Sequence, residues 1–227
     1  MLSIVVCHIF QAYHNKWADV FNMGVQVFLV MSGYLYGYKY ITEWHDWVKK
    51  RVKKIYLPYI IFLIAVIPLY VLFHNEAMKW KAVPFYFLNL QGFRLLVGGE
   101  FGRIEGLRHV WFITAIMCAY FVTPILQKVK KQSNTALPIL LALVAVAYIV
   151  FPSLRYVFVF SWVYLYAIGY LFVNLSRKWK LFYLGICLVV LIYLLYLCVN
   201  LGWKGYRHPY QYPYRLIHDI VGIISVP

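Results

Sequence analysis

A histidine inside an apolar run is the first residue whose type could support chemistry. His8 stands in the run from Met1 to Phe10, and an ionisable side chain at membrane depth is costly enough to mark a candidate site. An imidazole can accept a proton at neutral pH, which a sugar hydroxyl requires as it attacks an acyl carbon. The alternative is a histidine at a helix end, hydrogen-bonded to a loop or to lipid headgroups.

A cluster of cations is the second candidate. Five of the six residues from Lys49 to Lys54 are basic, and they precede an apolar run that we expect to become helical near Pro58. Such a cluster next to a membrane helix binds anionic lipid headgroups. Alternatively, it binds a phosphate-rich cytosolic ligand, because guanidinium and ammonium groups pair with phosphate oxygens. Charge alone does not separate these two hypotheses.

Small and aromatic residues form the remaining candidates. Gly33 and Gly37 create a small-xxx-small face that lets a second helix approach closely. Ser32 lacks a Gly-x-Ser-x-Gly turn, so we expect it to hydrogen-bond across helices or to line a cavity. Trp111 follows His109 at the start of a helix that runs through Tyr120, where it serves as an interfacial anchor or as part of a substrate path.

The composition places these residues in a membrane protein. Of the 227 residues, 64% are hydrophobic and 13% are charged, which excludes an ordinary soluble domain. The net charge of +15 would suggest nucleic acid in a soluble protein, but here the basic residues cluster between long apolar runs, so no nucleic acid is expected. The four cysteines lie in apolar runs without metal-ligand spacing, and no metal site is expected.

The elements that must position the candidates are membrane helices. At ~20 residues per crossing, the chain has room for about seven to eight helices in one all-α, multi-pass transmembrane bundle over residues 1–227. We expect helices at 1–10, 21–38, 55–73, 107–126, 136–151, 154–173 and 181–201, and from near 215 to the end. The first and last runs are too short to span a bilayer, so both ends are expected to be incomplete.

The basic residues also predict the orientation. With a cytoplasmic N-terminus, the inside loops at 39–54, 127–135 and 174–180 hold twelve Lys and Arg residues, against eight in the longer outside loops. The longest loop, 74–106, then lies outside. It contains the partly apolar stretch Val83–Val97, which predicts a re-entrant or interfacial helix in either a binding loop or a plain surface loop.

The order of these motifs resembles the integral-membrane acyltransferase 3 family of bacterial enzymes that O-acylate polysaccharides and other surface glycans. The resemblance rests on His8, the run Val27–Leu35, the run Lys50–Tyr59, and His109–Ile113 with Tyr120 and Pro124. It is densest over residues 1–126. Two departures stand out: a lysine, Lys54, replaces the second arginine of the basic motif, and the basic residue that the family carries eleven positions before its histidine falls outside the chain.

The resemblance implies a function and roles for these residues. A bacterial inner-membrane O-acyltransferase would transfer an acyl group, most simply acetyl, from acyl-coenzyme A to a glycan hydroxyl, with no bound cofactor. His8 would be the catalytic residue, and Ser32, Gly33, Trp111 and Tyr120 would line the path or support it. The coenzyme A phosphates would be bound by four basic residues, Arg51, Lys54, Lys50 and Lys53. Alternative hypotheses are a transporter or glycan flippase and an inactive remnant of an acyltransferase.

Overall fold

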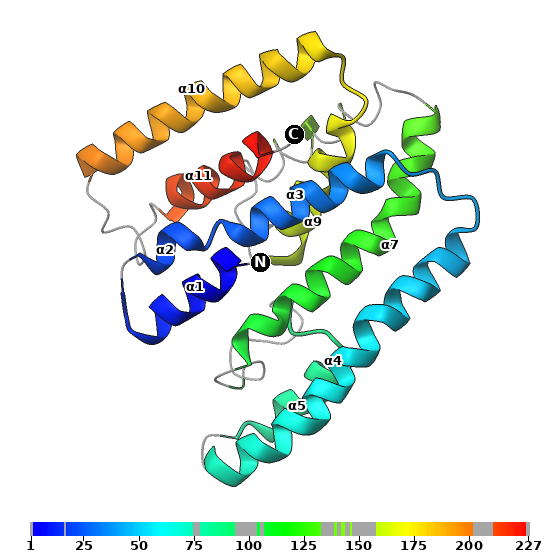
Figure 1. The fold of residues 1–227 in the computed structure, drawn as a ribbon, viewed down its shortest axis with the longest axis vertical. Helices are drawn as coiled ribbons and strands as arrows, with labels where there is room; N and C mark the ends of the chain where they lie inside the picture. The colour runs from blue at the N-terminus through cyan, green and yellow to red at the C-terminus, as the bar shows by residue number, and fades with distance from the viewer. Residues whose placement is uncertain are drawn as a thin grey trace. The chain divides into compact units, whose positions relative to one another are not determined.

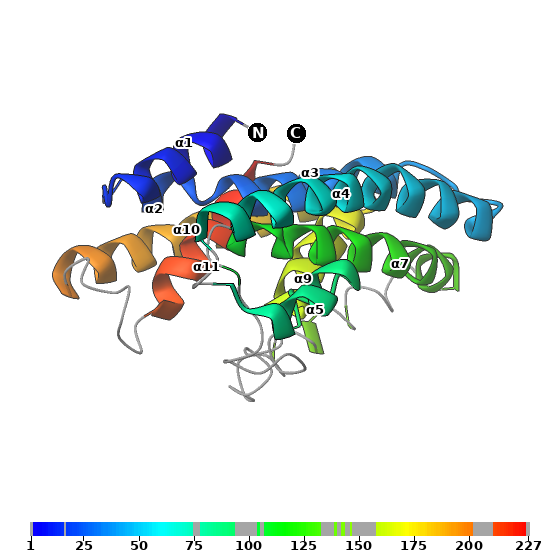
Figure 2. The same cartoon turned by 90° about the horizontal axis from the view of Figure 1, so that it is seen from below.

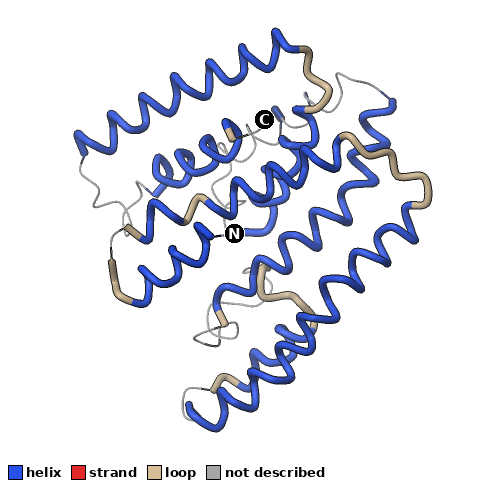
Figure 3. The backbone as a smooth tube through the Cα atoms, in the orientation of Figure 1, coloured by secondary structure: helices blue, strands red, loops and turns tan. Residues whose placement is uncertain are grey.

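Helices joined by short loops and turns make up the described part of the chain, which contains no strand, as expected for an all-α membrane bundle (Figure 3). The computed structural model describes residues 2–15, 17–74, 78–93, 104, 107–132, 139, 142–143, 146, 158–201 and 211–225. These residues fall into two compact units, Met1–Lys39 with Leu165–Pro227, and Tyr40–Tyr164. The sequence-predicted helix at 136–151 lies almost entirely outside the described residues.

The first unit gathers helices from both ends of the chain. It contains α1 (Leu2–Ala12), α2 (Ala18–Phe21), α3 (Gly24–Gly37), α10 (Arg177–Leu201), α11 (Gln211–Ile224) and the end of α9 (Phe158–Phe172). Figure 1 shows α11 lying between α10 and α3, and it packs against both. The hydroxyl of Ser3 donates a hydrogen bond of 2.7 Å to the carbonyl of Phe21 and ties α1 to α2.

Glycines let α3 and α9 touch through their backbones. A Cβ atom on Gly33 would lie 1.9 Å from the carbonyl oxygen of Tyr166, and one on Gly169 would lie 1.9 Å from that of Val30. Real atoms cannot approach so closely, so any larger residue would force the helices apart. The small-residue face of α3 is therefore in close contact with another helix, as its spacing predicts.

The second unit is built on an antiparallel helix pair. α4 (Trp44–His74) packs beside α7 (Trp111–Gln132), as Figures 1 and 2 both show. The side-chain amide of Gln127 donates to the carbonyl of Ile41 at 2.8 Å and accepts from its N–H at 2.8 Å. These two hydrogen bonds hold the start of α4 against the end of α7. The basic residues of both ends, Lys49–Lys54 and Lys128–Lys131, therefore belong to one end of the pair.

α4 begins eleven residues earlier than the apolar pattern predicts. The expected start was Ile55, with residues 39–54 as a loop, but the helix runs from Trp44 and includes the whole basic cluster. Pro58 lies inside the helix rather than at its start. Lysine and arginine are good helix formers although they are not apolar, and interior prolines are tolerated in membrane helices. Hydropathy therefore marks the apolar part of this helix but not the residue at which the helix begins.

The chain after α4 returns to the middle of that helix. A 3-10 turn (Trp80–Ala82) leads into α5 (Val83–Phe87), and a second turn (Arg108–Val110) leads into α7. The predicted helix Val83–Val97 is wrong in length, because the described chain leaves α5 at Leu88 and Asn89 adopts a φ of 54°. The hydrophobic core of this unit contains Tyr59, Leu63, Ile67, Met78, Ala82, Tyr86, Ile104, Leu107 and Val110.

Three described helices are long and apolar enough to cross a membrane. They are Trp44–Phe73, Trp111–Lys131 and Arg177–Tyr196. Two cysteines in apolar helices, Cys7 and Cys187, are buried, as small hydrophobic residues are. The long apolar spans agree with the membrane protein that the composition predicts.

Candidate functional site

His8 lies on the exposed side of α1. Its neighbour Cys7 is buried at 2% exposure, whereas the imidazole is exposed and its Nδ1 lies 3.0 Å from Oε1 of Gln11. When Nδ1 carries the proton it donates to that oxygen, and Nε2 then holds the lone pair. The contact joins residues three apart on one helix face. The geometry suits a proton acceptor, and it also suits a histidine held locally at a helix surface.

Ser32 and Gly33 belong to the same unit as His8. Ser32 is half-buried, and within the described part of the chain its hydroxyl has no hydrogen-bond partner. Gly33 is buried against the backbone of Tyr166. Gly33 thus contributes helix packing, and the role of Ser32 stays a prediction.

The basic cluster of α4 does not form a single patch. Residues two positions apart on an α-helix are rotated by about 200°, so Arg51 points away from Lys49 and Lys53. Lys50 and Lys54 are exposed and lie between these directions. One phosphate group therefore cannot contact all the cations of this cluster together.

Aromatic rings hold Arg51 in place. Its guanidinium carbon lies 5.7 Å from the ring centre of Trp47, which is within cation–π range. The Trp47 ring in turn meets the ring of Tyr120 edge-on at 5.7 Å. Arg51 is half-buried, in contrast to the exposed lysines around it. The structure thereby joins two sequence-predicted site residues, Arg51 and Tyr120, through an aromatic residue that the sequence analysis missed.

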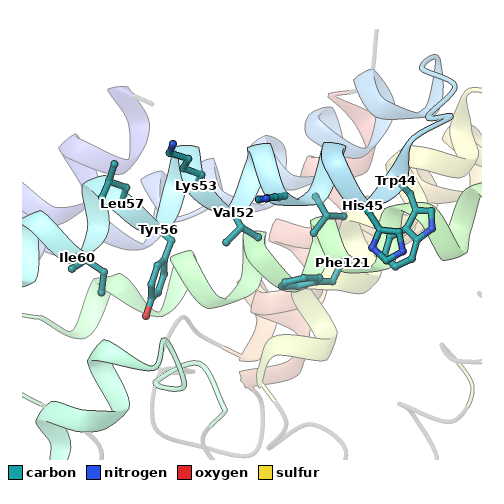
Figure 4. A pocket seen from close by; sticks show the side chains of 10 residues that line it. Trp44, His45, Val52, Lys53, Tyr56, Leu57, Ile60 and Phe121 are labelled. Atoms are coloured by element: carbon teal, nitrogen blue, oxygen red, sulfur yellow. The ribbon is translucent and has the colours of Figure 1, made fainter.

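The opposite side of the cluster borders a groove. It has a volume of about 670 Å³ and is lined by Trp44, His45, Val48, Lys49, Val52, Lys53, Tyr56, Leu57, Ile60 and Phe121. Figure 4 shows Lys53 and Leu57 along one edge of the groove and Val52, Tyr56 and Phe121 along the other. Of the four predicted phosphate-binding residues, Lys53 lines the groove, and Arg51, Lys50 and Lys54 do not.

Trp111 packs inside its unit. Its ring stacks on that of Trp162 at 4.7 Å with 33° between the planes, and it meets Phe112 edge-on at 6.1 Å. Trp111 is half-buried and the nearby His109 is exposed. These contacts give Trp111 a packing role at the start of α7.

A buried polar network lies where the long loop meets α4 and α7. The Thr114 hydroxyl lies 2.9 Å from Oδ1 of Asn89 and 3.0 Å from its carbonyl oxygen. The amide of Gln91 donates to the hydroxyl of Tyr59 at 2.9 Å, and that hydroxyl donates to the carbonyl of Tyr86 at 2.7 Å. Polar residues in a long loop are the only sequence signal of this network, because its members meet only in the folded unit.

The sequence-predicted residues therefore fall into two groups. His8, Ser32 and Gly33 belong to the first unit, and the α4 cations, Trp111 and Tyr120 belong to the second. Among the described residues, no three His, Cys, Asp or Glu side chains gather where they could hold a metal ion.

Comparison with known proteins assigns the chain to a family. The model of the acyltransferase domain of the acyltransferase 3 family matches residues 1–226. No curated protein and no solved structure matched the chain. Because the family match covers nearly every residue, the chain belongs to the acyltransferase 3 family and is a membrane acyltransferase.

Proposed function

We propose that this protein transfers an acyl group, most simply acetyl, from acyl-coenzyme A to a hydroxyl of a surface or secreted glycan. The enzyme is an O-acetyltransferase of the bacterial inner membrane, with its N-terminus and the basic ends of α4 and α7 in the cytoplasm. Family membership supports the acyl transfer. The choice of donor, acceptor and orientation is our proposal.

Arg51 carries the proposal for the donor. A long cationic side chain normally loses conformational freedom when it binds phosphate, but the Trp47 ring already holds this guanidinium in one region. Guanidinium presents a planar fork that fits two phosphate oxygens at once. Lys50 and Lys54, one and three positions away, add charge on the adjoining surface. Lys54 offers a point charge rather than a second fork.

His8 carries the proposal for the chemistry. As a general base it takes the proton of the glycan hydroxyl while the hydroxyl oxygen bonds to the thioester carbonyl carbon. The C–S bond then breaks, and the sulfur of coenzyme A leaves with that proton. As an acyl carrier, a ring nitrogen of His8 instead takes the acyl group as coenzyme A leaves, and the hydroxyl removes it in a second step. Both routes require the same residue.

Radiolabelled acetyl-coenzyme A tests the proposed donor. Purified protein in nanodiscs should bind it saturably, and Arg51→Ala should weaken binding by at least ~10-fold, the scale of one charge-assisted hydrogen-bonded pair. Transfer of label to a polysaccharide acceptor should fall in parallel. Arg177→Ala is the matched control, because it removes an exposed arginine from α10, in the other unit. Glycan movement without label transfer would instead favour a transporter.

A further inference from the structure

The groove beside α4 combines an apolar floor with two cations. Val48, Val52, Leu57, Ile60 and Phe121 supply aliphatic and aromatic surface. Lys49 and Lys53 are the two cations among the lining residues, and no acidic residue is among those that the structure describes there. Within the described part of the chain, neither lysine forms an ion pair or a hydrogen bond. The groove therefore offers two unpaired positive charges beside a surface that favours hydrocarbon.

The two properties are ordered along the helix. The lysines lie at the basic end of the membrane span, and Ile60 lies seven residues beyond Lys53, in the apolar part of the span. At ~1.5 Å per residue, this distance is about 10 Å along the axis. The rings of Trp44 and His45 precede the lysines at the start of α4, with their centres 3.4 Å apart and their planes tilted by 34°. Aromatic residues of this kind prefer the headgroup level of a bilayer.

We propose that this groove binds one anionic phospholipid. The headgroup phosphate lies between Lys49 and Lys53, and an acyl chain follows Tyr56, Leu57 and Ile60 towards the bilayer interior. The charge fits a phosphodiester, and the order of polar and apolar surface fits an amphiphile that enters from the membrane. A nucleotide fits less well, because most of the lining is carbon surface that cannot pair with a sugar or a base.

The proposal does not depend on acyl transfer. The cations of α4 then have different roles: Arg51 packs on the aromatic pair of Trp47 and Tyr120, and Lys49 and Lys53 contact lipid. A bound lipid would bridge α4 to Phe121 of α7 and so stabilise the helix pair of the second unit. The chemistry that selects the occupant is a single negative headgroup with at least one long acyl chain.

Native mass spectrometry with phosphatidylglycerol tests the headgroup contact. Lys49→Gln with Lys53→Gln should lower the retention of phosphatidylglycerol roughly tenfold, because two charges are removed from the groove. Lys50→Gln with Lys54→Gln removes the same charge from positions outside the groove, and retention should change less than about twofold. Phosphatidylcholine should be retained weakly by all three proteins. Equal losses in both double variants would overturn the proposal, because they would indicate general charge attraction.

A second pair of variants tests the acyl chain. Ile60→Asn places a polar group in the groove and should lower retention, whereas Ile61→Asn, one position away and outside the groove, should not. Comparable Tm values for the two variants would show that both fold. Equal retention in both would contradict the proposal. The proposal would also be contradicted if Lys49→Gln with Lys53→Gln lost acetyl-coenzyme A binding but still retained phosphatidylglycerol. The occupant of the groove would then be the acyl donor.

Discussion

Neighbouring residues of one cationic run have different surroundings in this protein. Arg51 is half-buried over an indole, while Lys53, two positions later, is exposed at a groove edge. The helix separates their directions, and the aromatic pair of Trp47 on α4 and Tyr120 on α7 lies on the side of Arg51. The residue types were visible in the sequence, but their sorting by direction requires the helix to be known.

Trp47 should act as a positioning residue for Arg51. We predict that Trp47→Leu raises the Kd for acetyl-coenzyme A about fivefold, the effect of losing a cation–π contact worth ~1 kcal/mol. Trp47→Phe keeps a ring and should show a smaller increase. Isothermal titration calorimetry measures both values. Trp179→Leu is the control, since it removes an exposed tryptophan from α10, and an unchanged Kd in Trp47→Leu would remove this role.

Gly33 should tolerate no side chain. Gly33→Ala would place a methyl group against the carbonyl of Tyr166, and overpacking of this kind costs roughly 1–3 kcal/mol. We predict a clear drop in Tm for the protein in detergent, measured by tryptophan fluorescence. Gly185→Ala is the matched control, because nothing lies within 4 Å of a Cβ at that helical position. Equal Tm values for the two variants would contradict the close contact of α3 and α9.

At the scale of elements, the sequence predicted the apolar helices well and the amphipathic parts poorly. α10 starts four residues before the predicted Leu181, and its last residue, Leu201, agrees with the prediction. α4 differs more, because Trp44 to Lys54 form helix without being apolar. In the long loop, the helix α5 is shorter than the predicted Val83–Val97, because the chain turns at Asn89, whose side chain accepts a hydrogen bond from Thr114 of α7. Such tertiary hydrogen bonds leave no periodic signal in the sequence.

The buried network should stabilise the packing of the loop on α7. Thr114→Val keeps the side-chain shape but removes the hydroxyl that donates to the buried Asn89, whose Oδ1 then keeps only the 3.3 Å bond from Gln91; such a loss costs about 1–3 kcal/mol. Thr123→Val is the control, because that buried hydroxyl bonds to the carbonyl of Ala119 in its own helix. Chemical denaturation in detergent should show the larger loss for Thr114→Val. A larger loss for Thr123→Val would argue against the network as the main contact.

At the scale of the whole molecule, two basic helix ends should share one membrane face. Gln127 bonds to Ile41 and so fixes the ends of α4 and α7 together. In a background without native cysteines, Lys50→Cys and Lys131→Cys should both react with a membrane-impermeant maleimide in inside-out vesicles. Neither should react in intact cells. Labelling of the two positions from opposite faces would contradict the antiparallel pair. Labelling of both from outside would reverse the proposed orientation.

Acetyl transfer by His8 variants is the most direct test of the proposed enzyme. His8→Asn should lower transfer of labelled acetyl from acetyl-coenzyme A to the glycan by about 10²–10⁴-fold, because a positioned base or carrier is lost. His14→Asn is the matched control: His14 is exposed just after α1 with a φ of 51°, which asparagine accepts. We predict full transfer in His14→Asn and almost none in His8→Asn. Unchanged glycan acetylation in a folded His8→Asn protein would contradict the account.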